Sequence, residues 1–360
     1  MNHKLTLSAA GIAAGLAATL IATPIMAQRE RGGGQNRPSR QCIQEVMQLC
    51  GQSGRPDRSK IRACLQEKSD ELSDECASEF QQRREQRGGQ REPTQAYQRA
   101  VKPTRTVFYG SDPRQQIDVY EPEGAVDDLP LVLFVHGGGW RAGDNKYVQQ
   151  KPAHFKQNDI YFASTGYRLL PDAPVEQQAA DVGAAVQSLV GQAGAVGFDA
   201  KRIVLMGHSS GAHLAALVGS DPKYAGDAFD AIRGVVLLDG AGYDVPTTIS
   251  DAKAEGRTRA MNLYREVFSD DPARQKALSA LSHVGGPDAP HWLALYVDGR
   301  TATQAQSQAL VNALVESGAS ASALPIVETD HSRMTREIGA EGGAAQTQAI
   351  DAFLAQVFGA

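Results

Sequence analysis

GHSSGAH, residues 207–213, places two adjacent serines between two glycines. Only one register fits the pattern Gly-x-Ser-x-Gly, and it puts Ser209 at the centre. The apolar run before the motif (201–207) predicts a strand, and the run after it (211–219) has helical spacing. A sharp turn from strand to helix exposes the central hydroxyl, and the flanking glycines leave room for neighbouring backbone. The stretch therefore predicts Ser209 as a nucleophile and gives the Ser210 side chain no chemical role.

An alternation of short strands and helices extends from residue 101 to residue 360. Strands are predicted at 105–110, 115–122, 129–137, 159–168, 201–207, 234–240, 291–299 and 323–329, and helices near 147–157, 175–193, 210–219, 303–318 and 343–357. Because nearly continuous apolar strands must be covered on both faces, the fold class is α/β, with a mostly parallel sheet, flanking helices and an antiparallel opening pair. The long stretch 241–290 between two strands is typical of a cap.

HGGGW, residues 136–140, follows the third predicted strand and precedes Ser209 in the chain. Acyl transfer builds negative charge on a carbonyl oxygen, and backbone N–H groups reach that oxygen best where no side chain blocks them. We therefore expect the N–H groups of Gly138, Gly139 and Ser210 to form an oxyanion hole. A glycine-rich loop without a role is the alternative, and the presence of both motifs in this order argues against it.

A serine hydroxyl needs a histidine to remove its proton and a carboxylate to hold that histidine. His331 follows the last predicted strand, and Asp298 ends the strand before it. Both residues fit the chain order serine, acid, histidine. The sequence predicts a triad of Ser209, Asp298 and His331, with Asp330 and Glu328 as alternative acids.

The overall composition bears on which partners and cofactors to expect. The 360 residues contain 36 Lys and Arg against 41 Asp and Glu, so nothing favours nucleic acid. No His, Asp, Glu or Cys residues have the spacing of a catalytic metal site, and we expect neither a metal nor another cofactor. The expected partner is an ester substrate, either a small molecule or an ester linked to a polysaccharide. The oligomeric state is left open.

The first residues predict export. A lysine, an apolar run and a stretch of small residues that ends at Ala27 are typical of a signal peptide at 1–27, and the alternative is a membrane anchor. After removal of the signal we expect no membrane span and a periplasmic or secreted location. The four cysteines, all within 42–76, agree with an oxidising compartment.

The cysteine segment predicts a small separate module. Residues 41–80 have two apolar helical patterns separated by a turn, and a hairpin of this size needs cross-links. In an antiparallel hairpin the outer cysteines face each other and so do the inner ones, which predicts Cys42–Cys76 and Cys50–Cys64 among the three connectivities that are open. Flexible linkers rich in Arg, Gln and Gly are expected at 28–40 and 81–100.

Two resemblances add to this interpretation. The cysteine spacing resembles one copy of the cysteine-rich repeat of the Golgi glycoprotein family. Residues 101–360 resemble the α/β-hydrolase superfamily, within it the esterases that carry HGGGW and a Tyr-Arg-Leu-x-Pro segment, here 167–171, followed by Asp181. Hormone-sensitive-lipase-like esterases, feruloyl and acetyl-xylan esterases and arylformamidases are the similar branches. Ser210 and Ala212 depart from the Ala and Gly that are common in the first branch.

The resemblance implies a carboxylesterase-type serine hydrolase without a cofactor. It would cleave small acyl or aryl-acyl esters, including those on plant polysaccharide, through an acyl-enzyme on Ser209. Trp140 and Tyr243 are candidate pocket residues. The alternatives are an arylformamidase-like amide hydrolase and a binding module without catalytic activity on a hydrolase scaffold.

Overall fold

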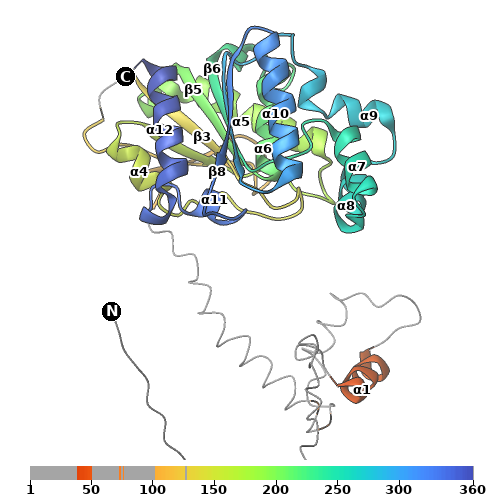
Figure 1. Cartoon of the computed structure of the whole chain (residues 1–360). Coiled ribbons are helices and arrows are strands. Elements are labelled where there is room, and N and C mark those ends of the chain that lie inside the picture. Colours follow the sequence, from red (N-terminus) through yellow and green to blue (C-terminus); the bar gives the residue numbers. More distant parts are fainter. Residues whose placement is uncertain (1–38, 51–72, 74–75, 77–101, 126–127, 360) are drawn as a thin grey trace, which may run out of the picture. The chain divides into compact units, whose positions relative to one another are not determined.

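The computed structural model describes residues 39–50, 73, 76, 102–125 and 128–359. The chain divides into two units, residues 1–94 and 95–360, which are described separately (Figure 1). The predicted signal peptide and the two predicted linkers lie outside the described residues, apart from residues 39–40 at the end of the first linker.

The second unit is built on one eight-stranded sheet with the order β1-β2-β4-β3-β5-β6-β7-β8. The strands are β1 (Arg105–Phe108), β2 (Gln116–Tyr120), β3 (Leu129–Val135), β4 (Tyr161–Thr165), β5 (Phe198–His208), β6 (Ile232–Leu238), β7 (His291–Val297) and β8 (Ser320–Ile326). β2 is antiparallel to both of its neighbours, and the remaining pairs are parallel. The predicted fold class and the antiparallel opening are confirmed.

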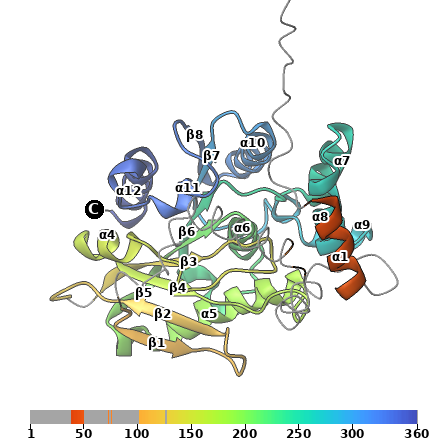
Figure 2. The same cartoon turned by 90° about the horizontal axis from the view of Figure 1, so that it is seen from below.

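Helices cover both faces of this sheet, because side chains alternate between the faces along each strand (Figure 2). The helices of the second unit are α4 (Lys151–Gln157), α5 (Val175–Val196), α6 (Ser210–Ser220), α7 (Val245–Ala254), α8 (Thr258–Phe268), α9 (Pro272–Ala277), α10 (Thr301–Glu316), α11 (Arg333–Arg336) and α12 (Ala344–Phe358). Short 3-10 helices lie at Gly226–Ala231, Ala280–Ser282 and Glu341–Gly343.

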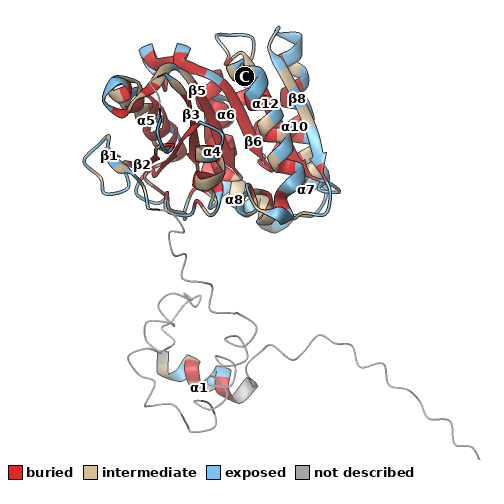
Figure 3. Ribbon diagram, turned by 90° about the vertical axis from the view of Figure 1, so that its left-hand side faces the viewer, coloured by how far each residue is buried: buried red, intermediate tan, exposed pale blue. Residues whose placement is uncertain are grey.

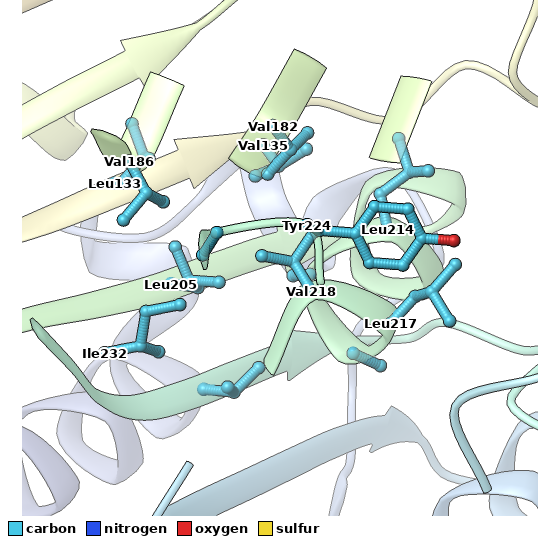
Figure 4. Packing of buried hydrophobic residues seen from close by; sticks show 14 of the residues in the cluster. Leu133, Val135, Val182, Val186, Leu205, Leu214, Leu217, Val218, Tyr224 and Ile232 are labelled. Carbon is cyan, nitrogen blue, oxygen red and sulfur yellow. The ribbon is translucent and has the colours of Figure 1, made fainter. Parts of the chain in front are cut away.

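Two apolar cores lie on opposite faces of the sheet. Leu133, Val135 and Leu205 point to the face covered by α5, α6 and α10, where they pack with residues such as Val182 and Leu214 (Figure 4). The intervening strand residues point to the other face, against α4 and α12. The inner strands are buried over most of their length, whereas the edge strands β1 and β8 are largely exposed (Figure 3). Because β3 to β8 are parallel, their carboxyl ends all lie at one end of the sheet, and the loops that follow them carry the candidate site.

The predicted cap at 241–290 is helical and contains α7, α8 and α9. Asp244 caps α7 by accepting a hydrogen bond from the Thr247 N–H, and Asp271 caps α9 in the same way through the Ala273 N–H. An ion pair between Arg274 and Glu176 at 2.7 Å connects α9 to the first turn of α5. The cap is thus attached to the helical layer that covers one face of the sheet.

In the first unit the described residues form α1 (Arg40–Cys50) and its contacts with two later residues. Cys42 and Cys76 form a disulfide with both side chains buried, so the predicted outer pair is present. The Glu45 carboxylate accepts hydrogen bonds from both the N–H and the hydroxyl of Ser73. The predicted inner pair, Cys50–Cys64, lies outside the side chains that the structure describes. Among the described helices, none is both long and apolar enough to span a membrane.

Candidate active site

Ser209 lies at the tip of the turn between β5 and α6. Its backbone has φ +56° and ψ −120°, a region that non-glycine residues rarely adopt. The Ser209 N–H donates to the Leu238 carbonyl at 3.0 Å, which ties the turn to the end of β6. A Cβ on Gly207 would lie 2.2 Å from the Gly211 carbonyl oxygen, and a Cβ on Gly211 would lie 2.2 Å from that of Val135. Both flanking positions therefore need glycine, and the turn stores strain at the one residue that presents its hydroxyl.

His331 lies in the loop between β8 and α11 and faces the Ser209 hydroxyl. Its Nε2 is 3.0 Å from Ser209 Oγ, and its Nδ1 is 2.6 Å from Oδ2 of Asp239. With Nδ1–H donating to the carboxylate, Nε2 is free to accept the serine proton. The structure thus brings Ser209 and His331 together, with a carboxylate behind the imidazole.

The carboxylate at His331 is Asp239, and the prediction of Asp298 is wrong on this point. Asp239 follows β6, directly beside the strand that carries Ser209, and its side chain is 0% exposed. Asp298 follows β7, one strand farther away, where it is exposed and its N–H donates to the Ile326 carbonyl. Asp330, one of the two alternative acids, is also excluded, because its carboxylate accepts from the N–H groups of Ser332 and Arg333.

Glu328, the other alternative acid, is exposed and has φ +56°. Its carbonyl accepts from Arg333 Nη1 at 2.9 Å. No hydrogen bond joins its carboxylate to His331 among the described residues.

The surroundings of Asp239 keep it ionised. Burial raises the pKa of Asp239, but the hydrogen bond from His331, the charge of Arg300 and the hydrogen bond from the Val297 N–H together hold that pKa below its ordinary value. Its backbone has φ +47°, so it is a second strained non-glycine residue at the site. A charged, rigidly held carboxylate can stabilise an imidazolium at His331.

His208 braces the histidine loop. Its Nε2–H donates to the His331 carbonyl at 2.7 Å, and the two rings are 4.7 Å apart between centroids. Burial, together with the neighbouring His331, lowers the pKa of His208 to about 3, so this ring stays neutral. A neutral His208 can hold the backbone of His331 without competing for its proton.

The HGGG loop follows β3 and lies against the nucleophile. A Cβ on Gly137 would be 3.0 Å from Ser209 Cβ. Gly138 and Gly139 have φ +141° and +63°, and the Gly138 carbonyl accepts from the N–H groups of Arg141 and Ala142. Neither the Gly138 nor the Gly139 N–H donates a hydrogen bond within the described part of the chain, and the Ser210 N–H opens a helix, where it has no intrahelical acceptor. These groups are available to an anion.

Trp140 and Tyr243 lie in the apolar core and do not form an open pocket wall. Trp140 is 3% exposed, and its ring packs edge-on against Tyr264 and Phe268 of α8. Its indole N–H donates to His213 Nδ1 at 3.4 Å. Tyr243 is 1% exposed. Neither side chain has the exposed surface that a substrate would contact, so their predicted pocket role is wrong in this structure.

The Tyr-Arg-Leu-x-Pro segment supports the same loops. The Tyr167 hydroxyl donates to the His136 carbonyl at 2.7 Å, and Asp181 accepts two hydrogen bonds from the Arg168 guanidinium. Tyr167 thus holds the HGGG loop, and the Arg168–Asp181 pair ties the segment to α5. Within the described ranges, no cluster of three or more His, Cys, Asp or Glu residues is arranged to hold a metal ion.

Comparisons with known proteins identify the family of this chain. The BD-FAE family model matches residues 117–314, more than half of the chain. A probable isoprenylcysteine alpha-carbonyl methylesterase of Arabidopsis thaliana is 26% identical over 204 residues, which are 53% of this chain and 41% of that protein. The kynurenine formamidase of Danio rerio is 28% identical over 238 residues, which are 65% of this chain and 77% of that protein.

Solved esterases share the fold. The apo form of Thermogutta terrifontis esterase 2 has a TM-score of 0.58 and 18% identity, and the alignment covers 70% of this chain and 94% of that one. The chain spans less than half the length of three of the methylesterases it matches. The BD-FAE match includes the HGGG loop, Ser209 and Asp239, and it ends before His331. The chain belongs to the BD-FAE family and has the α/β-hydrolase fold of esterases.

Proposed function

We propose that this protein is a serine hydrolase that cleaves small acyl or aryl-acyl carboxylic esters, with ester groups on plant polysaccharide as one substrate class. The observation that carries the proposal is the row of hydrogen bonds from Ser209 Oγ to His331 Nε2 at 3.0 Å and from His331 Nδ1 to Asp239 at 2.6 Å. This row ends beside a loop with free backbone N–H groups, which is what acyl transfer requires.

The proposed reaction has two steps. Ser209 Oγ attacks the ester carbonyl carbon while His331 Nε2 takes its proton, and the tetrahedral intermediate places its negative oxygen at the N–H groups of Gly138, Gly139 and Ser210. His331 then gives the proton to the departing alcohol oxygen, which leaves the acyl group on Ser209. Water repeats the sequence with His331 as the base and releases the acid.

The names of the relatives favour esters. Both the methylesterase of Arabidopsis thaliana and the solved esterase of Thermogutta terrifontis are named for ester cleavage. The similarity to kynurenine formamidase extends over more of both chains than the similarity to the methylesterase, and it supports an arylformamidase as a second candidate. The same catalytic arrangement can serve an amide, since the steps differ only in the leaving group.

A binding module without catalytic activity is the weaker alternative. Such a protein has no chemical reason to keep strained backbones at Ser209 and Asp239, or a carboxylate buried behind His331. The proposed site of action is outside the cytoplasm, which is supported by the signal-like residues 1–27 and the Cys42–Cys76 disulfide.

The test is to measure initial hydrolysis rates of the purified protein on p-nitrophenyl acetate, methyl ferulate and N-formylkynurenine, with the Ser209→Ala protein as the blank. We expect turnover of at least one ester that disappears in the blank. Turnover of N-formylkynurenine alone would support the amide hydrolase instead. A folded protein that hydrolyses none of the three would contradict both candidates.

Gly138→Ala is expected to lower kcat for ester hydrolysis by about 10² to 10³-fold, the usual effect of losing one oxyanion donor. The new Cβ would lie 2.0 Å from the Ala142 carbonyl oxygen, so the loop must move away from Ser209. Gly191→Ala on α5 is the matched control, because no atom lies within 4 Å of its new Cβ.

The control variant should keep its activity and raise the free energy of unfolding by about 0.5 to 1 kcal/mol, since alanine is the better helix residue. Initial rates at saturating p-nitrophenyl acetate and thermal unfolding check both expectations. Wild-type kcat in Gly138→Ala would show that this loop does not hold the oxyanion.

A further inference from the structure

Arg300 lies at the start of α10, where local helix energetics do not favour it. Its N–H donates to the Val297 carbonyl at 3.1 Å, and its own carbonyl accepts from the Gln304 N–H and the Thr303 hydroxyl at 3.0 Å each. Its backbone position is therefore fixed by the turn that follows β7. The helix dipole repels a cation at the helix N-terminus. The arginine side chain also cannot accept hydrogen bonds from the free N–H groups there. The reason for an arginine must lie elsewhere.

The Arg300 side chain reaches the carboxylate behind His331. Its Nη1 is 2.5 Å from Asp239 Oδ2, the same oxygen that lies 2.6 Å from His331 Nδ1. Two donors thus share one carboxylate oxygen. The Asp239 side chain is 0% exposed, whereas that of Arg300 is 42% exposed, so the guanidinium covers the buried acid from the solvent side.

We propose that Arg300 is a positioning residue: it fixes the Asp239 carboxylate behind His331, and its charge opposes a positive charge on the His331 ring. The inference rests on the proposed function of Ser209 and His331. It does not depend on the identity of the substrate.

The physical argument concerns the charge that His331 acquires. When His331 takes the serine proton, an imidazolium forms next to Asp239, which stabilises it. The guanidinium of Arg300 already neutralises part of that carboxylate, and it also repels the new positive charge. Both effects oppose a positive charge on the ring, so the loss of Arg300 should reduce labelling of Ser209 most in acidic solution. The partial exposure of Arg300 weakens the effect by solvent screening but does not change its direction.

Other charged groups face the pair from neighbouring elements. His208 on β5 remains neutral, because burial lowers its pKa to about 3. Lys151 on α4 is fully buried, and burial lowers the pKa of its amine to about 7, so its charge changes within the working range and acts on His208. Tyr243, which follows β6, stays neutral because burial raises its pKa well above the ordinary value.

The loop of His331 itself carries further charges. Asp330 accepts from two backbone N–H groups, and the one of Arg333 is the main reason that the pKa of Asp330 is lowered. The Arg333 guanidinium is held by Glu337 at 2.8 Å, and it also donates to the Glu328 carbonyl. None of these charged groups is replaced in an Arg300 variant. A difference between the two therefore isolates the charge at position 300.

The experiment measures the rate at which a fluorophosphonate probe labels Ser209 between pH 4.5 and 9, in the wild type, Arg300→Gln, Arg300→Lys and Arg265→Gln. Labelling needs an activated serine but no particular ester. The last variant removes one positive charge from an exposed ion pair on the cap and controls for net charge. We expect the acidic limb of the labelling profile to move to higher pH by about one unit in Arg300→Gln, the lower end of the shift caused by a nearby charge.

In Arg300→Lys and Arg265→Gln the limb should stay within a few tenths of a unit of the wild type. A loss of rate in Arg300→Gln that is equal at every pH would overturn the inference, because it would indicate only a structural role. An unshifted limb would do the same. If the wild type is labelled but hydrolyses no ester, the proposed substrate is wrong while the role of Arg300 is still tested.

Discussion

Ser209→Ala is expected to lower kcat by about 10⁶-fold, the usual effect of removing the nucleophile of a serine hydrolase. The hydroxyl of Ser209 is the one that lies 3.0 Å from His331 Nε2, and among the described residues no other hydroxyl is hydrogen-bonded to this ring. Ser210→Ala is the matched control, since the two serines are adjacent. The Ser210 side chain is 3% exposed, and only its backbone N–H is assigned a role.

The comparison requires both variants to be folded. Alanine at 209 keeps a Cβ in the strained backbone of φ +56°, and the Leu238 carbonyl still accepts its N–H, so thermal unfolding should match that of the wild type. Steady-state rates on the ester that the wild type hydrolyses best, together with a thermal melt, give the result. An inactive Ser210→Ala protein beside an active Ser209→Ala protein would show that the motif has been assigned in the wrong register.

Local sequence patterns predicted the nucleophile, and the physical reason is visible in the structure. The reversal between β5 and α6 needs glycine at two fixed positions around Ser209, and the HGGG loop needs positive φ at Gly138 and Gly139. These are requirements of a few consecutive residues, so they leave a readable pattern. The eight strands were also predicted, and the buried parallel ones were readable because they are continuous apolar runs.

The acid could not be chosen in this way. Two strands are followed by Asp-Gly, β6 by Asp239 and β7 by Asp298, and both acids lie between Ser209 and His331 in the chain. The choice between the two acids depends on where the loop after β8 places His331 relative to the ends of β6 and β7. That placement is set by the packing of three strands and cannot be read from one segment. The strand order would have favoured Asp239, because β6 lies next to β5 and so brings its carboxylate nearer to Ser209.

The structure also shows why the pocket prediction failed. An aromatic residue next to a motif can line a pocket or fill the core, and sequence spacing does not distinguish the two. Trp140 is fully enclosed because α8 of the cap places Tyr264 and Phe268 against it. The start of β8 was likewise missed by three residues, since its first residues are Ser and Ala and lack the β-branched pattern.

Asp239→Asn should lower kcat by about 10⁴-fold, whereas Asp298→Asn should leave kcat within about twofold of the wild type. Asparagine keeps the size of the side chain, but its amide can donate to His331 Nδ1, which would then have to accept. The ring would carry its proton on Nε2, facing Ser209, and could not act as a base. Asp298 is exposed and makes no hydrogen bond to His331 among the described residues, so its replacement changes only a surface charge.

The measurement is kcat for both variants under identical conditions, with fluorophosphonate labelling as a second readout of serine activation. The exposed Asp298 serves as the matched control, because both substitutions replace a strand-end Asp before a Gly with Asn. The reverse result, an inactive Asp298→Asn protein and an active Asp239→Asn protein, would mean that His331 turns to β7 during catalysis. Loss of activity in Asp239→Asn alone would place the acid of this site after β6, the strand that neighbours the one carrying Ser209.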